Sequence, residues 1–195
     1  MGFTRAELEA HCGREVEDLL GPDLRLLFVG INPGLWTAAV QTHFAHPANR
    51  FYPALLRAGI IERTISPAEG MTDEDRAHVT ARGIGITNLV RRATARADEL
   101  SPAELREGGE RVRELVAERR PAVVAVAGIT AYRQAFANRG ATLGRQAQTD
   151  DDAARWSKAA LWVVPNPSGL NAHETVATLA AAYAAPAAAA GVIAG

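Results

Sequence analysis

Four short apolar runs, separated by longer amphipathic stretches, constrain most strongly what this chain can fold into. The runs cover 24–31 (LRLLFVGI), 83–89 (GIGITNL), 122–127 (AVVAVA) and 161–164 (LWVV), and loop-forming residues follow each of them. Runs of this kind are typical of strands buried on both faces, and their alternation with helical stretches favours a parallel sheet covered by helices. The pattern therefore predicts an α/β fold with a core of four strands.

Helical patterns fill the segments between these runs. The clearest start lies at Ser101, which can cap a helix whose first turn contains Pro102 and Glu104. Gly108 and Gly109 lie inside the same helix, and the pair predicts either a kink or the close approach of another backbone. The expected helices cover about 4–20, 49–59, 72–81, 101–120, 130–138 and 172–185.

Length and composition predict a single domain over residues 1–195. The chain is 48% hydrophobic, which suffices for one compact core but not for two large domains. We expect an N-terminal helix at about 4–20, a core at about 24–185, and a flexible tail at about 186–195. Pro186 should break the last helix, and the alanine-rich end offers little to pack.

Cysteine content and charge narrow the setting and the partners. The single Cys12 excludes an internal disulfide and a thiolate-rich metal centre, which favours the cytoplasm. No segment approaches the roughly 20 apolar residues of a membrane span, and the N-terminus lacks the apolar core of a signal peptide. The net charge of −1 argues against coating nucleic acid by bulk electrostatics, but it leaves room for a local basic face. We expect a soluble monomer with no membrane partner.

Three of the four runs are followed by unusual loops, and parallel sheets bind ligands beyond the carboxyl ends of their strands. The first run leads into 30–34 (GINPG), and the last leads into 165–171 (PNPSGLN). The second run ends at Asn88, and the densest basic stretch of the chain follows it, with Arg91, Arg92 and Arg96. We expect these three loops to share one rim.

Each of these features also has an ordinary structural interpretation. Asn-Pro-Gly is a common turn, and Ser168 lacks the Gly-x-Ser-x-Gly elbow of a hydrolase nucleophile. Asn171 can cap the last helix with Glu174, and Leu170 is either a core residue or an exposed wedge. Phe44 can simply pack its loop.

Metal chemistry has little support in the sequence. His43 and His46 are separated by two residues, but no cysteine or acidic cluster accompanies them, so no metal site and no cofactor are expected. The acidic run 150–152 (DDD) also lacks companion ligands and predicts a solvated turn rather than a metal-dependent nuclease.

Four motifs, in chain order, resemble those of the mismatch-specific uracil-DNA and thymine-DNA glycosylase family. The resemblance extends from about Leu24 to Tyr183. The motifs are GINPG, FAHPANRFYP, GITNLVRRATARADELSPAELREGG and PNPSGLN. This resemblance implies a three-layer α/β/α sandwich with a central, mainly parallel sheet.

The resemblance also assigns roles around a base pocket. It implies that Asn32 holds the attacking water, that Phe44 stacks on a flipped base, and that the backbone near Ile31 and Phe44 binds the edge of the base. Asn88 occupies a position where some relatives have lysine. The remaining pocket residues implied in this way are Gly30, Gly34 and Thr37.

The last motif resembles the insertion loop of that family. Leu170 would then fill the gap left by the flipped nucleotide, and Ser168, Gly169 and Asn171 would form the loop around it. Further DNA contacts would come from Arg91, from His173 in place of an arginine in several relatives, and from the N–H groups of a helix beginning near Ala172.

The implied function is hydrolytic excision of uracil from mismatched double-stranded DNA, preferentially opposite guanine, leaving an abasic site. Ethenocytosine, thymine and deaminated purines are further candidate bases. Two alternatives come from other classes. One is a DNA- or nucleotide-binding α/β domain without turnover, and the other is a small-molecule hydrolase that uses Ser168.

Overall fold

A five-stranded sheet in the order β2-β1-β3-β5-β4 forms the centre of the molecule, in a computed structural model that describes residues 2–195. All neighbouring strands pair in parallel except β4, which pairs antiparallel with β5. The strands are β1 (Leu26–Gly30), β2 (Ile84–Asn88), β3 (Val123–Ala127), β4 (Gly144–Arg145) and β5 (Ala160–Val164). The α/β fold and its four predicted core strands are confirmed, but the sheet has a fifth strand, because two-residue β4 has no apolar run to reveal it.

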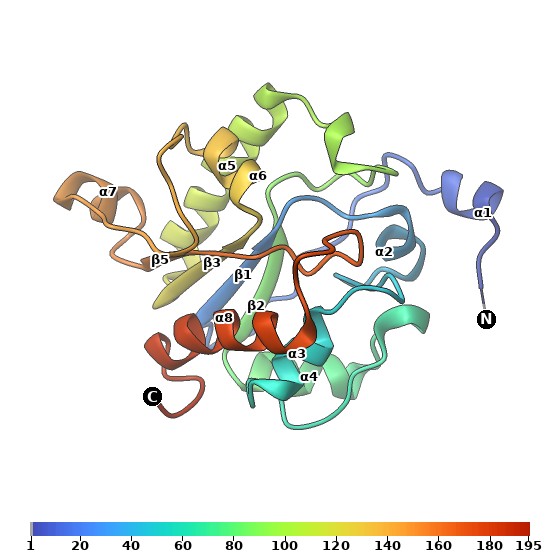
Figure 1. Cartoon of the computed structure of the whole chain (residues 1–195), viewed down its shortest axis with the longest axis horizontal. Helices are drawn as coiled ribbons and strands as arrows, with labels where there is room; N and C mark the ends of the chain where they lie inside the picture. The colour runs from blue at the N-terminus through green and yellow to red at the C-terminus, as the bar shows by residue number, and fades with distance from the viewer. Residues whose placement is uncertain (1) are drawn as a thin grey trace.

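Helices cover both faces of this sheet (Figure 1), with α3, α4 and α8 on one face and α5 and α6 on the other. Alternate residues of β1 point to the two layers, so that Leu26 and Phe28 pack under the first group while Leu27 and Val29 pack under the second. The helices are α1 (Arg5–Glu9), α2 (Leu35–Val40), α3 (Phe51–Arg57), α4 (Asp73–Ala81), α5 (Pro102–Arg119), α6 (Ile129–Ala135), α7 (Asp150–Arg155) and α8 (Val176–Ala189). The three-layer sandwich is therefore confirmed.

Helix α5 begins as predicted, and the backbone packed against it accounts for its two internal glycines. Ser101 and Glu104 form a capping box around Pro102. Both glycines are buried, and the helix runs through them without interruption. A Cβ atom on Gly108 would overlap the carbonyl group of Leu89, and one on Gly109 would lie 2.9 Å from the Ala135 oxygen. Of the two interpretations, close approach of another backbone is the correct one.

The N-terminal helix is shorter than predicted. It covers only Arg5–Glu9, and Gly13 follows with a φ of 78°. The spacing of Val16 and Leu19 suits a helix, but this segment is extended, and Leu19 exchanges two backbone hydrogen bonds with Ile86 at 2.8 and 2.9 Å. Because β2 lies at the edge of the sheet, its free backbone groups are satisfied by the segment before β1 rather than by solvent.

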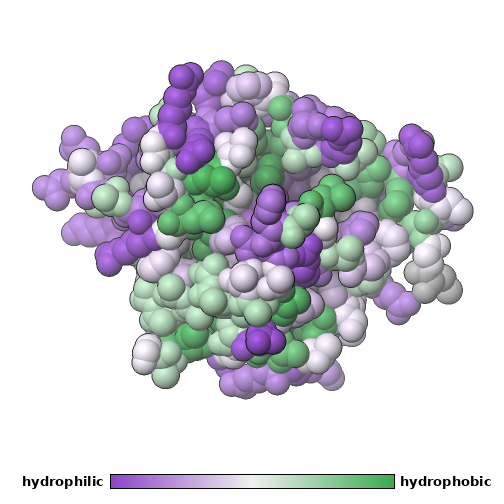
Figure 2. Space-filling model, viewed as in Figure 1, coloured by the Kyte–Doolittle hydropathy of each residue, from purple (hydrophilic) through white to green (hydrophobic). Residues whose placement is uncertain are grey.

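The C-terminal end is also different from the expectation of a flexible tail. Helix α8 continues through Pro186 to Ala189, and the side chains of Ala187 and Val192 are buried in the core. The outer side of α8 consists largely of alanine and gives the pale, weakly hydrophobic surface in Figure 2. The helix begins at Val176 rather than near residue 172, because Thr175 and not Asn171 caps it.

Two short helices were not predicted. Residues 150–152 form the first turn of α7, capped by Thr149, instead of a solvated turn. Helix α2 directly follows the GINPG motif, with Gly34 as its N-cap. None of the helices within residues 2–195 is long and apolar enough to cross a membrane.

Candidate active site

A cavity of about 640 Å³ opens at the carboxyl edge of the sheet. Its walls come from the loops after β1, β2 and β5, together with the segment between α2 and α3. Thus the three loops that the sequence singled out do share one rim. The cavity is lined by every residue expected in the base pocket and by part of the expected insertion loop, namely Gly30, Ile31, Asn32, Gly34, Thr37, Phe44, Asn88, Ser168, Gly169 and Leu170.

Asn32 is held in one orientation by the groups around its amide nitrogen. Nδ2 donates to the Thr94 hydroxyl at 2.7 Å and to the carbonyl oxygens of Pro33 and Arg92 at 3.1 and 3.2 Å. The Thr94 hydroxyl donates its own proton to the Arg96 carbonyl at 2.8 Å, so it can only accept from Asn32. With three acceptors around the nitrogen, the Asn32 oxygen is left to accept a hydrogen bond from a guest in the cavity.

Asn88 is oriented by a buried histidine. His43 is 4% exposed, and its Nε2 lies 2.9 Å from the carbonyl oxygen of Glu17, so Nε2 carries the proton and Nδ1 is a bare acceptor. Nδ1 lies 3.0 Å from the Asn88 Nδ2, which must be the donor. The Asn88 oxygen then lies over Gly30, where an added Cβ atom would overlap it. Asn88 therefore presents an acceptor to the cavity.

Acidification should weaken the fold through His43. Burial lowers the pKa of His43 below its ordinary value of 6.5. As the pH falls below 6.5 the unfolded chain takes up this proton before the folded protein does, so stability that is fully present above pH 6.5 is lost below it. We expect the free energy of unfolding to fall more steeply between pH 7 and pH 5 in the native protein than in His43→Gln, by at most about 1.4 kcal/mol per pH unit. Equal slopes in urea titrations across this range would contradict the assignment of a neutral His43.

Phe44 forms the aromatic wall of the cavity in a strained conformation. Its φ is 56°, a left-handed value that is uncommon for a bulky residue. Its ring stacks on Phe51 with centroids 4.1 Å apart. The Tyr52 hydroxyl donates to the His43 carbonyl at 3.0 Å, and Thr37 accepts from the Ala45 N–H at 3.3 Å, so neighbours on both sides hold this turn in place.

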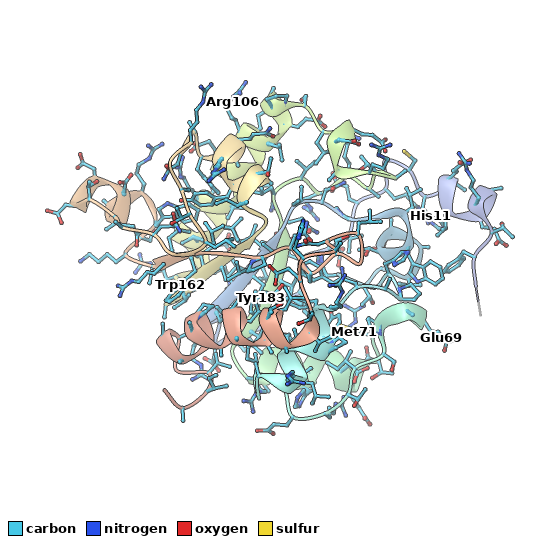
Figure 3. All side chains as sticks on the ribbon, viewed as in Figure 1. His11, Glu69, Met71, Arg106, Trp162 and Tyr183 are labelled. Atoms are coloured by element: carbon cyan, nitrogen blue, oxygen red, sulfur yellow. The ribbon has the colours of Figure 1, made fainter. Side chains whose placement is uncertain are left out.

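The loop between β5 and α8, residues 165–174, is called here the Leu170 loop. It starts at Pro165, whose carbonyl accepts a hydrogen bond of 2.9 Å from Tyr183, on the side of α8 that faces the sheet (Figure 3). The Asn171 Nδ2 donates to the Asn166 carbonyl at 3.1 Å, and the Leu170 N–H donates to Ser168 Oγ at 3.3 Å. These bonds fold the loop inward while Leu170 remains 92% exposed.

The sequence of this chain also matches a known protein family over most of its length. The model of the Uracil DNA glycosylase superfamily matches residues 17–185. This chain belongs to the uracil DNA glycosylase superfamily. A solution NMR structure of a protein from Methanosarcina acetivorans, proposed to be a uracil DNA glycosylase, is similar with a TM-score of 0.56 and 15% identity, over 88% of this chain and 98% of that one. At this identity the structural likeness shows the fold alone.

Two of the residues expected to contact DNA lie outside the cavity. Arg91 and His173 do not line the cavity, and His173 is exposed. The arginines after β2 are paired with acidic side chains: Arg91 Nε lies 3.5 Å from Glu15, and Arg96 pairs with Asp98 at the cavity rim. The resulting surface carries less free positive charge than the sequence suggested.

The remaining arginine of this stretch, Arg92, is also paired with an acidic side chain. Arg92 Nε donates to Glu104 at 2.6 Å. This hydrogen bond, together with those from Ser101, lowers the pKa of Glu104 to about 2. Arg92 thus ties the loop after β2 to the start of α5.

The sequence did not single out three residues that shape this superfamily site. Thr94 fixes Asn32, and His43 fixes Asn88, a role that its spacing from His46 in the sequence does not reveal. Arg111 supports the end of β2 by donating to the Asn88 carbonyl and, at 3.1 Å, to the Thr87 hydroxyl. Thr94 lies two residues after the arginine pair, and its place in the third motif is the signal that could have revealed it. Within residues 2–195 no group of three or more His, Cys, Asp or Glu side chains is arranged to hold a metal ion.

Proposed function

We propose that this protein flips uracil out of mismatched double-stranded DNA, preferentially opposite guanine, and removes it by hydrolysis, leaving an abasic site. The observation that carries the proposal is the orientation of Asn32, whose amide nitrogen is fully engaged while its oxygen is free at the cavity. An amide oxygen in this position can accept a hydrogen bond from a water molecule and aim it at a sugar carbon. The mismatch preference rests on the sequence motifs, which resemble those of mismatch-specific glycosylases.

The chemistry requires a placed nucleophile and little else from the protein. Cleavage of an N-glycosidic bond builds positive charge on the sugar and negative charge on the departing base. The water held by Asn32 would attack the anomeric carbon, and the base would leave with the bonding electron pair. An amide does not titrate and is a weak proton acceptor, so turnover should be slow. The water would release its proton to solvent as the attack completes, and the departing base anion would take up one proton from solvent to become uracil.

Two cavity residues support a pyrimidine as the guest. The ring of Phe44 can stack on a flipped base, because Phe51 already holds its other face. The Asn88 oxygen is an acceptor and matches the N3–H group of uracil or thymine. Gly30 leaves the space between Phe44 and Asn88 open, since a Cβ atom there would meet both side chains.

Leu170 supports the proposal that the target base is extruded from a duplex. A leucine that is 92% exposed on an otherwise internally bonded loop has no packing role in the free protein. Inserted into the base stack, it would fill the gap left by the flipped nucleotide. Unstacking costs a few kcal/mol and least for a mismatched base, which favours uracil opposite guanine over uracil opposite adenine.

The alternative hydrolase is less well supported by the site. Ser168 Oγ accepts the N–H of Leu170 at 3.3 Å, and among the hydrogen bonds of residues 2–195 none joins Ser168 to a histidine. A DNA-binding domain without turnover would have the same cavity, so only activity separates it from the proposed enzyme. Three expectations about this protein remain predictions: that it lies in the cytoplasm, that it acts as a monomer, and that it needs no metal or cofactor.

The test is release of uracil from three labelled substrates, with uracil opposite guanine, opposite adenine, or in a single strand. We expect the fastest single-turnover release opposite guanine, by about tenfold or more over adenine, because a wobble pair is weaker to open. Equal rates on both duplexes would contradict the mismatch preference. Binding without release from any of the three would favour the non-enzymatic domain.

A further inference from the structure

We propose that Arg50 is a positioning residue that holds the Leu170 loop in the shape that presents Leu170 to DNA. This inference rests on the proposed function. Arg50 is the N-cap residue of α3, and its guanidinium group extends into the Leu170 loop. Nη1 donates to the carbonyl of Glu174, and Nη2 lies 3.3 Å from the carbonyl oxygen of Ser168, 3.1 Å from that of Gly169 and 3.2 Å from that of Asn171.

A ring of four carbonyl oxygens needs a donor of this particular kind. The loop forms neither helix nor strand over residues 165–174, so these carbonyls have no ladder to join. Turn hydrogen bonds within the loop reach only two of them, Ser168 from the Asn171 N–H at 3.0 Å and Asn171 from the Glu174 N–H at 3.4 Å. Arginine offers five N–H donors in a planar fork and no acceptor, whereas lysine concentrates its donors at one point. Arg50 is half-buried, so water competes less for the same oxygens. The guanidinium group therefore acts as the centre around which the loop is folded.

The same residue joins the Leu170 loop to the segment that carries Phe44. The backbone N–H of Arg50 donates to the Pro167 carbonyl at 3.0 Å. Gly169 lies so close to Ala48 that an added Cβ atom would be 2.7 Å from both the Ala48 Cβ and its carbonyl oxygen. The loop is thus docked on residues 48–50, six or fewer positions beyond the aromatic wall of the cavity.

A preformed loop matters only when a base must be extruded from a duplex. Leu170 reaches outward from a turn whose carbonyls point inward to Arg50, so the cation fixes both the direction and the height of the exposed side chain. If the loop were mobile in the free protein, it would lose conformational entropy on binding DNA, and this loss would raise the free-energy cost of base extrusion. A single-stranded uracil is already unpaired and makes no use of the wedge. Loss of Arg50 should consequently slow reaction on duplex substrates selectively.

The experiment compares Arg50→Met, which keeps an unbranched apolar stem but removes the guanidinium donors, with Arg57→Met at an exposed position of the same helix. Single-turnover release is measured on a uracil·guanine duplex and on single-stranded uracil, in the native and in the Leu170→Ala background. We expect Arg50→Met to slow the duplex reaction about tenfold or more, to change the single-strand rate by less than about threefold, and to add little once Leu170 is gone. Arg57→Met should leave all rates unchanged.

Thermal melting of each variant shows whether it is folded. If Arg50→Met does not fold, the same comparison is made with Arg50→Lys, which keeps the charge. Equal losses on single-stranded and duplex substrates would overturn the inference, because Arg50 would then support only the pocket or the fold. Full additivity with Leu170→Ala would also overturn it. If the native protein releases uracil from no substrate, the proposed function itself has failed. That result differs from the two outcomes above, in which the native protein is active and only the role of Arg50 is wrong.

Discussion

Replacing Asn32 with alanine is expected to slow uracil release by about 10²–10⁴-fold, the range spanned when a group that handles the attacking nucleophile is lost. The amide oxygen of Asn32 is the acceptor that faces the cavity, and alanine would leave the water unaligned. The measurement is single-turnover release from a uracil·guanine duplex, with duplex binding and thermal melting recorded in parallel. The variant should stay folded and bind the duplex, with melting lowered only by the loss of the hydrogen bonds from the Asn32 amide to Thr94 and to the Pro33 and Arg92 carbonyls.

Thr94 provides the graded control for this prediction. Thr94→Val removes one of the three acceptors that orient the Asn32 amide, whereas Thr94→Ser keeps the hydroxyl group. We expect valine to slow release by about tenfold, in proportion to one lost hydrogen bond, and serine to have little effect. If Asn32→Ala retains native activity, another residue positions the nucleophile and the site assignment is wrong.

Replacing Gly108 with alanine is expected to destabilise the protein by about 2–4 kcal/mol, although helix propensity alone predicts a gain of about 1 kcal/mol. The added Cβ atom would overlap the backbone carbonyl group of Leu89, with the carbonyl carbon 2.7 Å away, and a backbone group cannot rotate aside. Gly109→Ala should cost less, because one of its closest neighbours is the movable ring of Phe136. Urea unfolding of both variants measures the two free energies.

Glu107→Ala, at the adjacent exposed position of α5, is the matched control and should change the free energy of unfolding by less than about 0.5 kcal/mol. Because Leu89 directly follows Asn88, the Gly108 variant should also lose affinity for the base. A stabilised Gly108→Ala protein would contradict the close approach of α5 to the end of β2.

The sheet could be read from the sequence because its strands are buried on both faces. Runs such as LRLLFVGI and AVVAVA need no partner to be recognised, and parallel strands bring their following loops to one edge. That rule alone was enough to place Asn32, Asn88 and the Leu170 loop around one cavity. Strand β4 and the extended segment before β1 were missed because they form by pairing with a strand edge, which local periodicity does not record.

The orientation of the polar side chains could not be predicted, because it depends on partners far apart in the chain. Asn32 is fixed by Thr94, and Asn88 by a histidine whose tautomer is set by the Glu17 carbonyl. The same limit applies to charge. Arginines that looked available in the sequence are paired with Glu15, Glu104 and Asp98. Arg50, at the start of an expected helix, contacts four carbonyls of a distant loop.

Hydrolysis of the glycosidic bond can be observed directly by running the reaction on a uracil·guanine duplex in water enriched in oxygen-18 and analysing the products by mass spectrometry. We expect free, unlabelled uracil and an intact strand whose abasic sugar carries one heavy oxygen atom. Unlabelled uracil would show that the base is not attacked and leaves unaltered, and an intact strand carrying an abasic sugar would show that only the glycosidic bond is broken. Recovery of the duplex with uracil still attached, or of label in the base, would contradict the claim that this protein is a hydrolytic uracil-DNA glycosylase.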